Sequence, residues 1–209
     1  PRPRAFRLPD DQALINRMGL NNAGAKAIRP RLEKAAGQIA FPVAVNLAKT
    51  HDPKIEGKAA IEDFCESFRI LAPWADYVAL NISCPNTAEG KTFEDPNSLD
   101  ELLSAIMTLR KELALEVPVV VKFSPPLAES FILDSLFDEL ILVCLGHGIH
   151  GFIATNTASD RNGLVTSKER ISKIGNGGLS GQPIRARANG LVKYLYRKTS
   201  GKLPIIGVG

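Results

Sequence analysis

One pattern recurs along the sequence: a short apolar run rich in Val and Ile, a polar residue at its end, and then a segment of helical composition. The runs cover residues 41–45, 77–80, 117–121, 151–154 and 204–206. Short β-branched runs that alternate with helices predict a parallel β-sheet. Because the runs are apolar almost throughout, they also predict that both faces of this sheet are covered.

The segments between the runs are predicted to be helices. Apolar residues recur with the spacing of an amphipathic helix in 61–71 and in 99–109. Ser98 and Glu101 are spaced as a capping box at the start of the second of these. Further helices are predicted over residues 23–36, 130–144 and 183–198.

The predicted fold class is therefore α/β. Polar residues at the strand ends favour a (β/α)8 TIM barrel, and a doubly wound open sheet is the alternative. A TIM barrel needs eight strands and about 250 residues, whereas this chain has 209 residues and five predicted strands. We therefore expect residues 1–209 to form a single incomplete barrel domain that supplies roughly the middle five strands.

Charge and composition exclude several classes of function. The chain has 26 Lys and Arg residues against 22 Asp and Glu, a net charge of +4. These residues are scattered and do not alternate with aromatic residues, which predicts a solvated surface and no nucleic-acid partner. No apolar run reaches ~18 residues, so the chain reads as soluble. No metal site is predicted, because the histidines lack ligand spacing and are interpreted as surface or helix-end residues: His51, His147 and His150.

Three stretches outside the repeating pattern are predicted to be irregular. Residues 1–12, rich in Pro and Arg, predict a segment that runs over the surface, and residues 16–22 predict a polar loop around Gly19. Residues 175–181 contain four glycines ahead of a helical segment. They predict a loop whose backbone N–H groups suit a phosphate.

The polar residues at the strand ends are the candidate site. Carboxamides at Asn46, Asn81, Asn86 and Asn156 both donate and accept hydrogen bonds. Several of them in one pocket would suit a ligand with alternating C=O and N–H groups, such as a flavin or a pyrimidine. A single Asn at a strand end is also an ordinary turn former, but the recurrence of the pattern favours a binding site.

Two further residues suggest chemistry. A lysine on a β-branched strand is costly unless its charge is used, so Lys122 suits an anion or a cofactor that gains negative charge on reduction. Cys84 is a candidate base, because a thiol can ionise near neutral pH and the resulting thiolate can accept a proton. The plainer interpretation of Cys84 is a small buried apolar residue.

With these residues in place, the sequence resembles the dihydroorotate dehydrogenases over its whole length. The motifs that carry the resemblance are residues 16–22, 45–46, 81–87, 121–122, 154–157, 177–183 and 205–209. Residues 1–9 and the Asn-Arg-Met-Gly loop resemble class 2 of this family, the quinone-dependent branch. The resemblance implies an FMN-containing barrel that oxidises dihydroorotate to orotate in pyrimidine synthesis. It also implies that a segment N-terminal to this chain docks on the cytoplasmic or inner membrane as a peripheral anchor.

The resemblance assigns a role to each matching residue. The residues expected to contact FMN are Asn46, Asn81, Lys122, Thr155 and Gly181. The residues expected to contact orotate are Asn16, Arg17, Met18, Gly19, Leu20, Asn86, Asn156 and Thr157. Cys84 takes the position of the catalytic base.

Cys84 departs from the class 2 pattern, which has serine at the base position, whereas class 1 has cysteine. The resemblance therefore leaves two kinds of electron acceptor open: a quinone, as in class 2, or fumarate or NAD, as in class 1. Polar strand ends of this kind would also fit an FMN barrel of the dihydropyrimidine dehydrogenase or dihydrouridine synthase type. A non-redox barrel that binds phosphate is a third kind of protein that they would fit.

Overall fold

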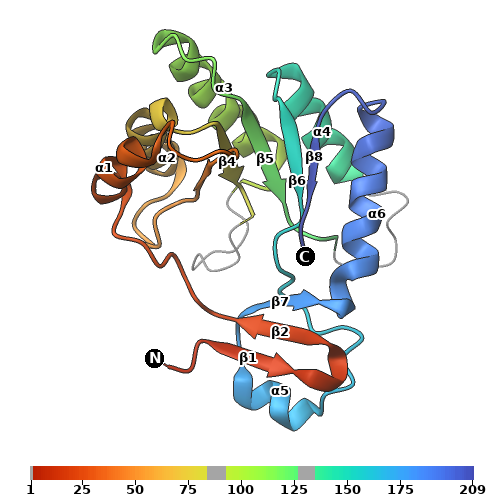
Figure 1. Cartoon of the computed structure of the whole chain (residues 1–209). Coiled ribbons are helices and arrows are strands. Elements are labelled where there is room, and N and C mark those ends of the chain that lie inside the picture. Colours follow the sequence, from red (N-terminus) through yellow and green to blue (C-terminus); the bar gives the residue numbers. More distant parts are fainter. Residues whose placement is uncertain (1, 84–92, 127–134) are drawn as a thin grey trace.

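The computed structural model describes residues 2–83, 93–126 and 135–209, which form two separate sheets (Figure 1). The larger is parallel and has the strand order β3 (Ala44–Leu47), β4 (Tyr77–Asn81), β5 (Val119–Phe123), β6 (Gly151–Ala154) and β8 (Ile205–Gly207). Each strand overlaps or directly follows one of the predicted apolar runs, so the predicted parallel sheet is confirmed.

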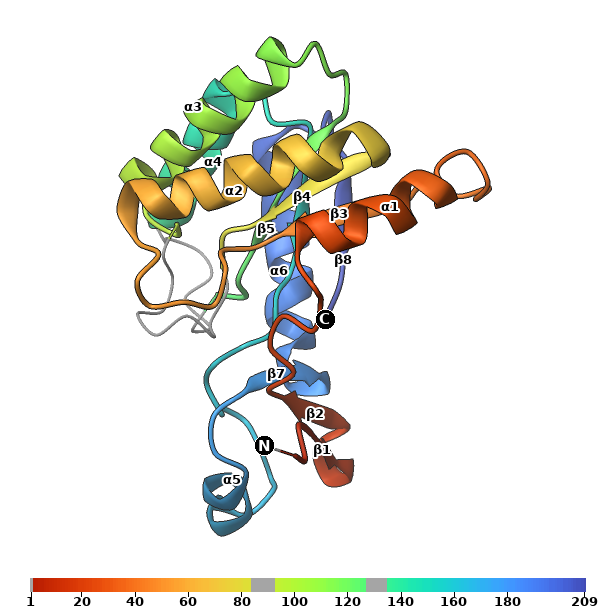
Figure 2. The same cartoon turned by 90° about the vertical axis from the view of Figure 1, so that its left-hand side faces the viewer.

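Helices cover one face of this sheet (Figures 1 and 2). They are α1 (Ala25–Ala35), α2 (Gly57–Leu71), α3 (Pro96–Glu112), α4 (Ser135–Gly146) and α6 (Gln182–Lys198), with a 3-10 turn, η2 (Ala72–Trp74), after α2. Their apolar stripes form one large core with the strands, in which Phe64 of α2, Ile106 of α3 and Leu191 of α6 are almost fully buried. Burial of such side chains contributes about 1.5–3 kcal/mol each.

The helix boundaries differ from the prediction, most clearly in α3 and α4. The helix α3 begins at Pro96, and the carboxylate of Asp95 caps it by accepting a hydrogen bond from the Ser98 backbone N–H at 3.0 Å. The predicted capping box of Ser98 and Glu101 is therefore wrong, because Ser98 already lies inside the first turn. For the helix predicted over 130–144, residues 130–134 lie outside the described residues and α4 continues to Gly146.

The smaller sheet is antiparallel and has the order β1 (Ala5–Leu8), β2 (Ala13–Asn16), β7 (Gly178–Gly181). A 3-10 turn, η1 (Pro9–Asp11), joins the first two strands. The prediction of an irregular segment over residues 1–12 is therefore wrong for residues 5–11, which form β1 and η1. The prediction of a glycine loop over 175–181 is wrong for residues 178–181, which form β7. Local sequence could not indicate this pairing, because β7 is more than 160 residues away from β2 along the chain.

Close backbone approach explains two of the glycines in this region. A Cβ on Gly181 would lie 2.5 Å from the Gln12 carbonyl oxygen, and one on Gly177 would lie 2.7 Å from that of Asn16. Both residues also have positive φ angles, 102° and 151°, and residues other than glycine rarely adopt such angles. Packing against β2 is therefore sufficient to require glycine at both positions.

A second, smaller core lies under this sheet and includes Leu8, Ile15 and Leu179 together with residues around α5 (Lys168–Ile174). The buried carboxylate of Asp11 joins the β1–β2 turn to the chain ahead of α5. It accepts hydrogen bonds from the backbone N–H groups of Val165 (2.6 Å) and Thr166 (3.1 Å) and from the Thr166 hydroxyl. Burial alone would raise the pKa of Asp11, but these hydrogen bonds outweigh it and the pKa is lowered.

The two sheets meet at the carboxyl end of the parallel strands. From the end of β6 the chain passes directly to the small sheet, and β8 ends on the same side (Figure 1). In α/β proteins with parallel strands this end of the sheet is where ligands bind.

Candidate functional site

Strand register brings three predicted residues to one face of the parallel sheet. Asn46 pairs with Ala79, and Asn81 pairs with Lys122. Because side chains alternate between faces, Asn46, Asn81 and Lys122 lie on the same face as Ala79 and Val120. That face is opposite the helices and has its own small apolar cluster.

A cavity of about 740 Å³ lies between these strand ends and the loop that follows β2. It gathers most of the residues that the sequence singled out. Its lining consists of Arg4, Asn16, Arg17, Met18, Gly19, Leu20, Asn21, Asn46, His51, Asn81, Lys122, Asn156 and Thr157. The fold thus brings carboxamides from β2, β3, β4 and the end of β6 together around one lysine.

Among the described residues predicted for the site, Thr155 and Gly181 do not line this cavity. Thr155 is buried at the end of β6, where its backbone N–H donates to the Val208 carbonyl and its hydroxyl to the Asn156 carbonyl, each at 2.8 Å. Gly181 lines a second cavity of about 470 Å³ between β6, β8 and the start of α6. Cys84 and Asn86 lie outside the described residues.

Two arginines hold the loop after β2 in place. The Arg4 guanidinium donates to the Met18 carbonyl at 3.2 Å and to Asn21 Oδ1 at 2.9 Å. Arg17 Nη1 donates to the Ile174 carbonyl at 2.5 Å, and the guanidinium lies 4.8 Å from the centre of the Phe6 ring. Arg17 Nε is buried and has no hydrogen-bond partner among the described residues. The loop therefore combines fixed geometry with positive charge and an unused donor.

Among the described strands of the parallel sheet, β5 alone contributes a cationic side chain to this cavity, Lys122. It is half-buried, and burial lowers the pKa of its ammonium group. In the described part of the chain no carboxylate forms an ion pair with it. An anionic group in the cavity would compensate the cost of burying this charge.

A hydrogen-bonded cluster joins the ends of β4 and β6. Asn156 Nδ2 lies 2.9 Å from both the carbonyl oxygen and the hydroxyl of Ser83, and 3.2 Å from Asn81 Oδ1. The Ser83 hydroxyl lies 3.2 Å from Asn81 Oδ1. Ser83 is fully buried, and Asn81 is only 9% exposed.

Three lining residues were not predicted as site residues: Arg4, Asn21 and His51. His51 was interpreted as a surface or helix-end residue, and it is exposed in the loop after β3, five residues beyond Asn46, where it also lines the cavity. The buried Lys49 shapes that loop by donating to the carbonyls of Asp52 (3.0 Å) and Ile55 (2.8 Å). Proximity to Asn46 in the sequence was the one signal that pointed to His51.

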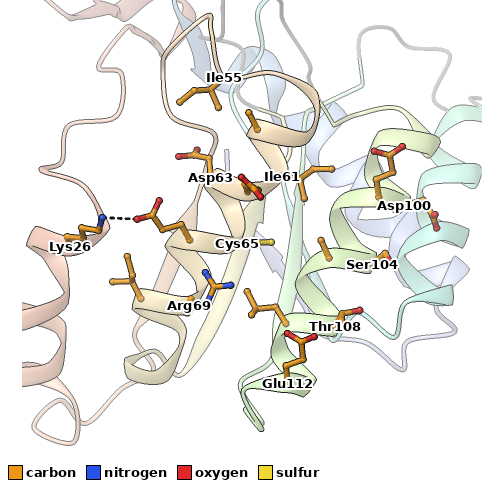
Figure 3. A pocket seen from close by; sticks show the side chains of 17 residues that line it. Lys26, Ile55, Ile61, Asp63, Cys65, Arg69, Asp100, Ser104, Thr108 and Glu112 are labelled. Carbon is orange, nitrogen blue, oxygen red and sulfur yellow. Dashed lines mark ion pairs between the residues drawn. The ribbon is translucent and has the colours of Figure 1, made fainter.

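A larger groove, of about 1250 Å³, lies elsewhere on the molecule (Figure 3). It separates α2 from α3 on their outer side, with Cys65 near its middle and Lys26 of α1 at one margin. Lys26 and Glu66 form an exposed ion pair across 2.9 Å. None of the predicted site residues that the structure describes lines this groove, so it is separate from the strand-end site.

Two negative findings apply to the described residues alone. No three or more His, Cys, Asp or Glu side chains are grouped there so as to hold a metal ion. No described helix combines the length and apolar character that crossing a bilayer requires.

A parallel sheet with carboxamides and a lysine at its strand ends defines an α/β protein with a candidate ligand-binding site at the carboxyl ends of its strands. The chain belongs to the dihydroorotate dehydrogenase family, whose model matches residues 1–209. Its relatives include the dihydroorotate dehydrogenases (quinone) of Chloroflexus aurantiacus and Salinispora arenicola, each 42% identical to it. These matches cover 100% of this chain but 56% and 57% of the relatives, so the chain spans a little over half their length.

Solved structures agree with this assignment. A ligand-free dihydroorotate dehydrogenase from Eimeria tenella superimposes with a TM-score of 0.83 at 31% identity, over 100% of this chain and 61% of the other. The same enzyme in complex with ferulenol gives a TM-score of 0.84 at 29% identity, over 100% and 60%. These enzymes are TIM barrels, which confirms the predicted fold class.

Proposed function

We propose that the protein to which this chain belongs is an FMN-dependent dihydroorotate dehydrogenase. It would oxidise dihydroorotate to orotate in the synthesis of pyrimidines, with a quinone as the final oxidant. One observation carries the proposal: a single cavity at the strand ends gathers carboxamides from four elements around Lys122. Membership of the family supports the same reaction.

The donor set of the cavity fits a flavin. An isoalloxazine ring offers alternating carbonyl and N–H groups, and the carboxamides of Asn46 and Asn81 would supply hydrogen-bond partners for them. The ammonium group of Lys122 would compensate the negative charge that the ring acquires on reduction. When bound, FMN supplies a hydride acceptor, which no protein side chain provides.

The residues of this chain would hold the substrate and move its proton. The loop 16–20, with Asn86, Asn156 and Thr157, would bind the pyrimidine ring and its carboxylate. Cys84 would accept the C5 proton of dihydroorotate as the C6 hydride leaves for the cofactor. Loss of this proton and hydride creates the C5–C6 double bond of orotate. Thr155 and Gly181 would complete the FMN contacts.

The electron acceptor is proposed from the relatives. Those cited above are named as quinone enzymes, and this supports a quinone and peripheral attachment to a membrane through a segment outside this chain. Cys84 is the feature that favours the class 1 acceptors, fumarate or NAD, as the second candidate.

The test is the colour of the intact protein. We expect a bound yellow chromophore that dihydroorotate bleaches under anaerobic conditions and that a quinone restores. Restoration by fumarate or NAD alone would assign the second candidate instead. A colourless preparation that gains no flavin when FMN is added would contradict the proposed function.

A further inference from the structure

Backbone groups fix the orientation of one carboxamide in the cluster between β4 and β6. The Thr157 backbone N–H donates to Asn156 Oδ1 at 2.9 Å. At its other end, Asn156 Nδ2 donates to the Ser83 carbonyl at 2.9 Å. A backbone N–H can only donate and a carbonyl can only accept, so the two contacts independently require the same orientation of Asn156.

The orientation of Asn156 in turn determines the orientation of the Asn81 carboxamide. Asn156 Nδ2 carries two hydrogens, which the Ser83 carbonyl and hydroxyl accept at 2.9 Å each, and it would repel a second amino group, so the atom of Asn81 that lies 3.2 Å from it is the carbonyl oxygen, Oδ1. The Ser83 hydroxyl reinforces this choice, since it accepts from Asn156 Nδ2 at 2.9 Å and can donate to Asn81 Oδ1 at 3.2 Å. Asn81 Oδ1 is therefore used within the protein, and Asn81 itself lines the cavity.

We propose that Ser83 is a positioning residue, which holds Asn81 so that its amino group, and not its carbonyl, faces the ligand. The side chain of Ser83 is fully buried and does not line the cavity, so it acts through Asn81 and Asn156. The partner of Asn81 in the ligand is then an acceptor, such as a ring carbonyl oxygen. The inference rests on the proposed function only for the identity of that ligand as FMN.

The first test measures FMN affinity in the intact protein after Ser83→Ala and Ser83→Cys. Alanine removes the hydroxyl, and cysteine replaces it with a somewhat larger group that hydrogen-bonds weakly, so we expect both variants to raise the Kd for FMN roughly three- to tenfold, the loss of one hydrogen bond. The matched control is Ser124→Ala, a buried serine just after β5 that does not line the cavity, and its Kd should stay unchanged. Wild-type affinity in Ser83→Cys would show that volume alone matters and would overturn the proposal.

The second test needs no ligand. In protein labelled with 15N at asparagine, the side-chain NH2 signals of Asn81 and Asn156 should shift and exchange faster with water after Ser83→Ala, but not after Ser124→Ala. Unchanged signals in Ser83→Ala would overturn the positioning role. If the unsubstituted protein bound no FMN, the proposed function would fail, while these signals would still decide the role of Ser83.

Discussion

Burial in the fold makes the positive charge of Lys122 unfavourable for stability. Burial lowers its pKa below the ordinary value of 10.5, so between the two values the unfolded chain binds more protons than the folded one. Stability therefore rises with pH as the pH passes through the lowered pKa towards 10.5. Such a cost persists in a protein where function uses the charge.

We predict that Lys122→Met makes the protein more stable at neutral pH and less able to reduce its flavin. The stability gain should shrink as the pH approaches 10.5, because wild-type Lys122 becomes neutral there. Thermal unfolding across pH measures the first effect, and stopped-flow flavin reduction with saturating dihydroorotate measures the second. The control is Lys193→Met, at an exposed lysine of α6, which should change neither. Wild-type flavin reduction in Lys122→Met would contradict a role for the charge.

Cys84 lies outside the described residues, and its role rests on its place in the motif 81–87. A thiol ionises at far lower pH than a serine hydroxyl does, so the thiolate that accepts the substrate proton is available at lower pH. We therefore predict that Cys84→Ser retains dehydrogenase activity and moves the pH–rate profile to higher pH. The profile of single-turnover flavin reduction measures this, and an unchanged profile would count against Cys84 as the base.

At the scale of elements, β7 positions Thr157 as well as pairing with β2. A Cβ on Gly178 would lie 2.0 Å from Thr157 Oγ1, so alanine there must displace Thr157 from the cavity. Ala158 forms backbone hydrogen bonds with Leu179 of β7 at 2.9 and 2.7 Å, which leaves this segment little freedom to adjust.

We predict that Gly178→Ala weakens orotate binding about tenfold or more and also lowers stability by about 1–3 kcal/mol through overpacking. Gly146→Ala is the control, because a Cβ there meets no atom within 4 Å, and it should bind orotate normally. Perturbation of the flavin spectrum by orotate reports the affinity. Wild-type binding in Gly178→Ala would mean that Thr157 does not contact the substrate.

At the scale of the whole molecule, a largely buried ion pair connects α6 to the chain beyond β6. Arg187 Nη1 lies 2.8 Å from Asp160 Oδ2 and 3.0 Å from the Pro126 carbonyl oxygen, and the two side chains are 13% and 16% exposed. Burial would raise the pKa of Asp160, but hydrogen bonds and the Arg187 charge outweigh it and the pKa lies below 3.8. The pair therefore contributes stability above pH 3.8, and the contribution is lost as the pH falls through the lowered pKa.

We predict that Arg187→Met costs about 2–4 kcal/mol at neutral pH, because it leaves Asp160 without its partner in a partly buried place. The double variant Arg187→Met/Asp160→Asn should recover part of that loss. Denaturant unfolding at pH 7 and near pH 3 measures both, and the deficit of Arg187→Met should be smaller at the acid end. An equal deficit at the two pH values would exclude the ion pair as its cause.

Sequence alone determined the parallel sheet, its helices and the identity of most cavity residues. The sheet and helices follow from local patterns: short, almost continuously apolar runs in the strands and a period of 3.6 in the helices. The asparagines and the lysine at the strand ends follow from the polar residue that ends each run, whereas the loop 16–20 and Thr157 follow from the resemblance to the family. Only the tertiary structure decided the antiparallel sheet of β1, β2 and β7, the entry of His51 and Arg4 into the cavity, and the role of Ser83. Each of these depends on contacts between segments far apart in the chain, and local periodicity contains no information about such contacts.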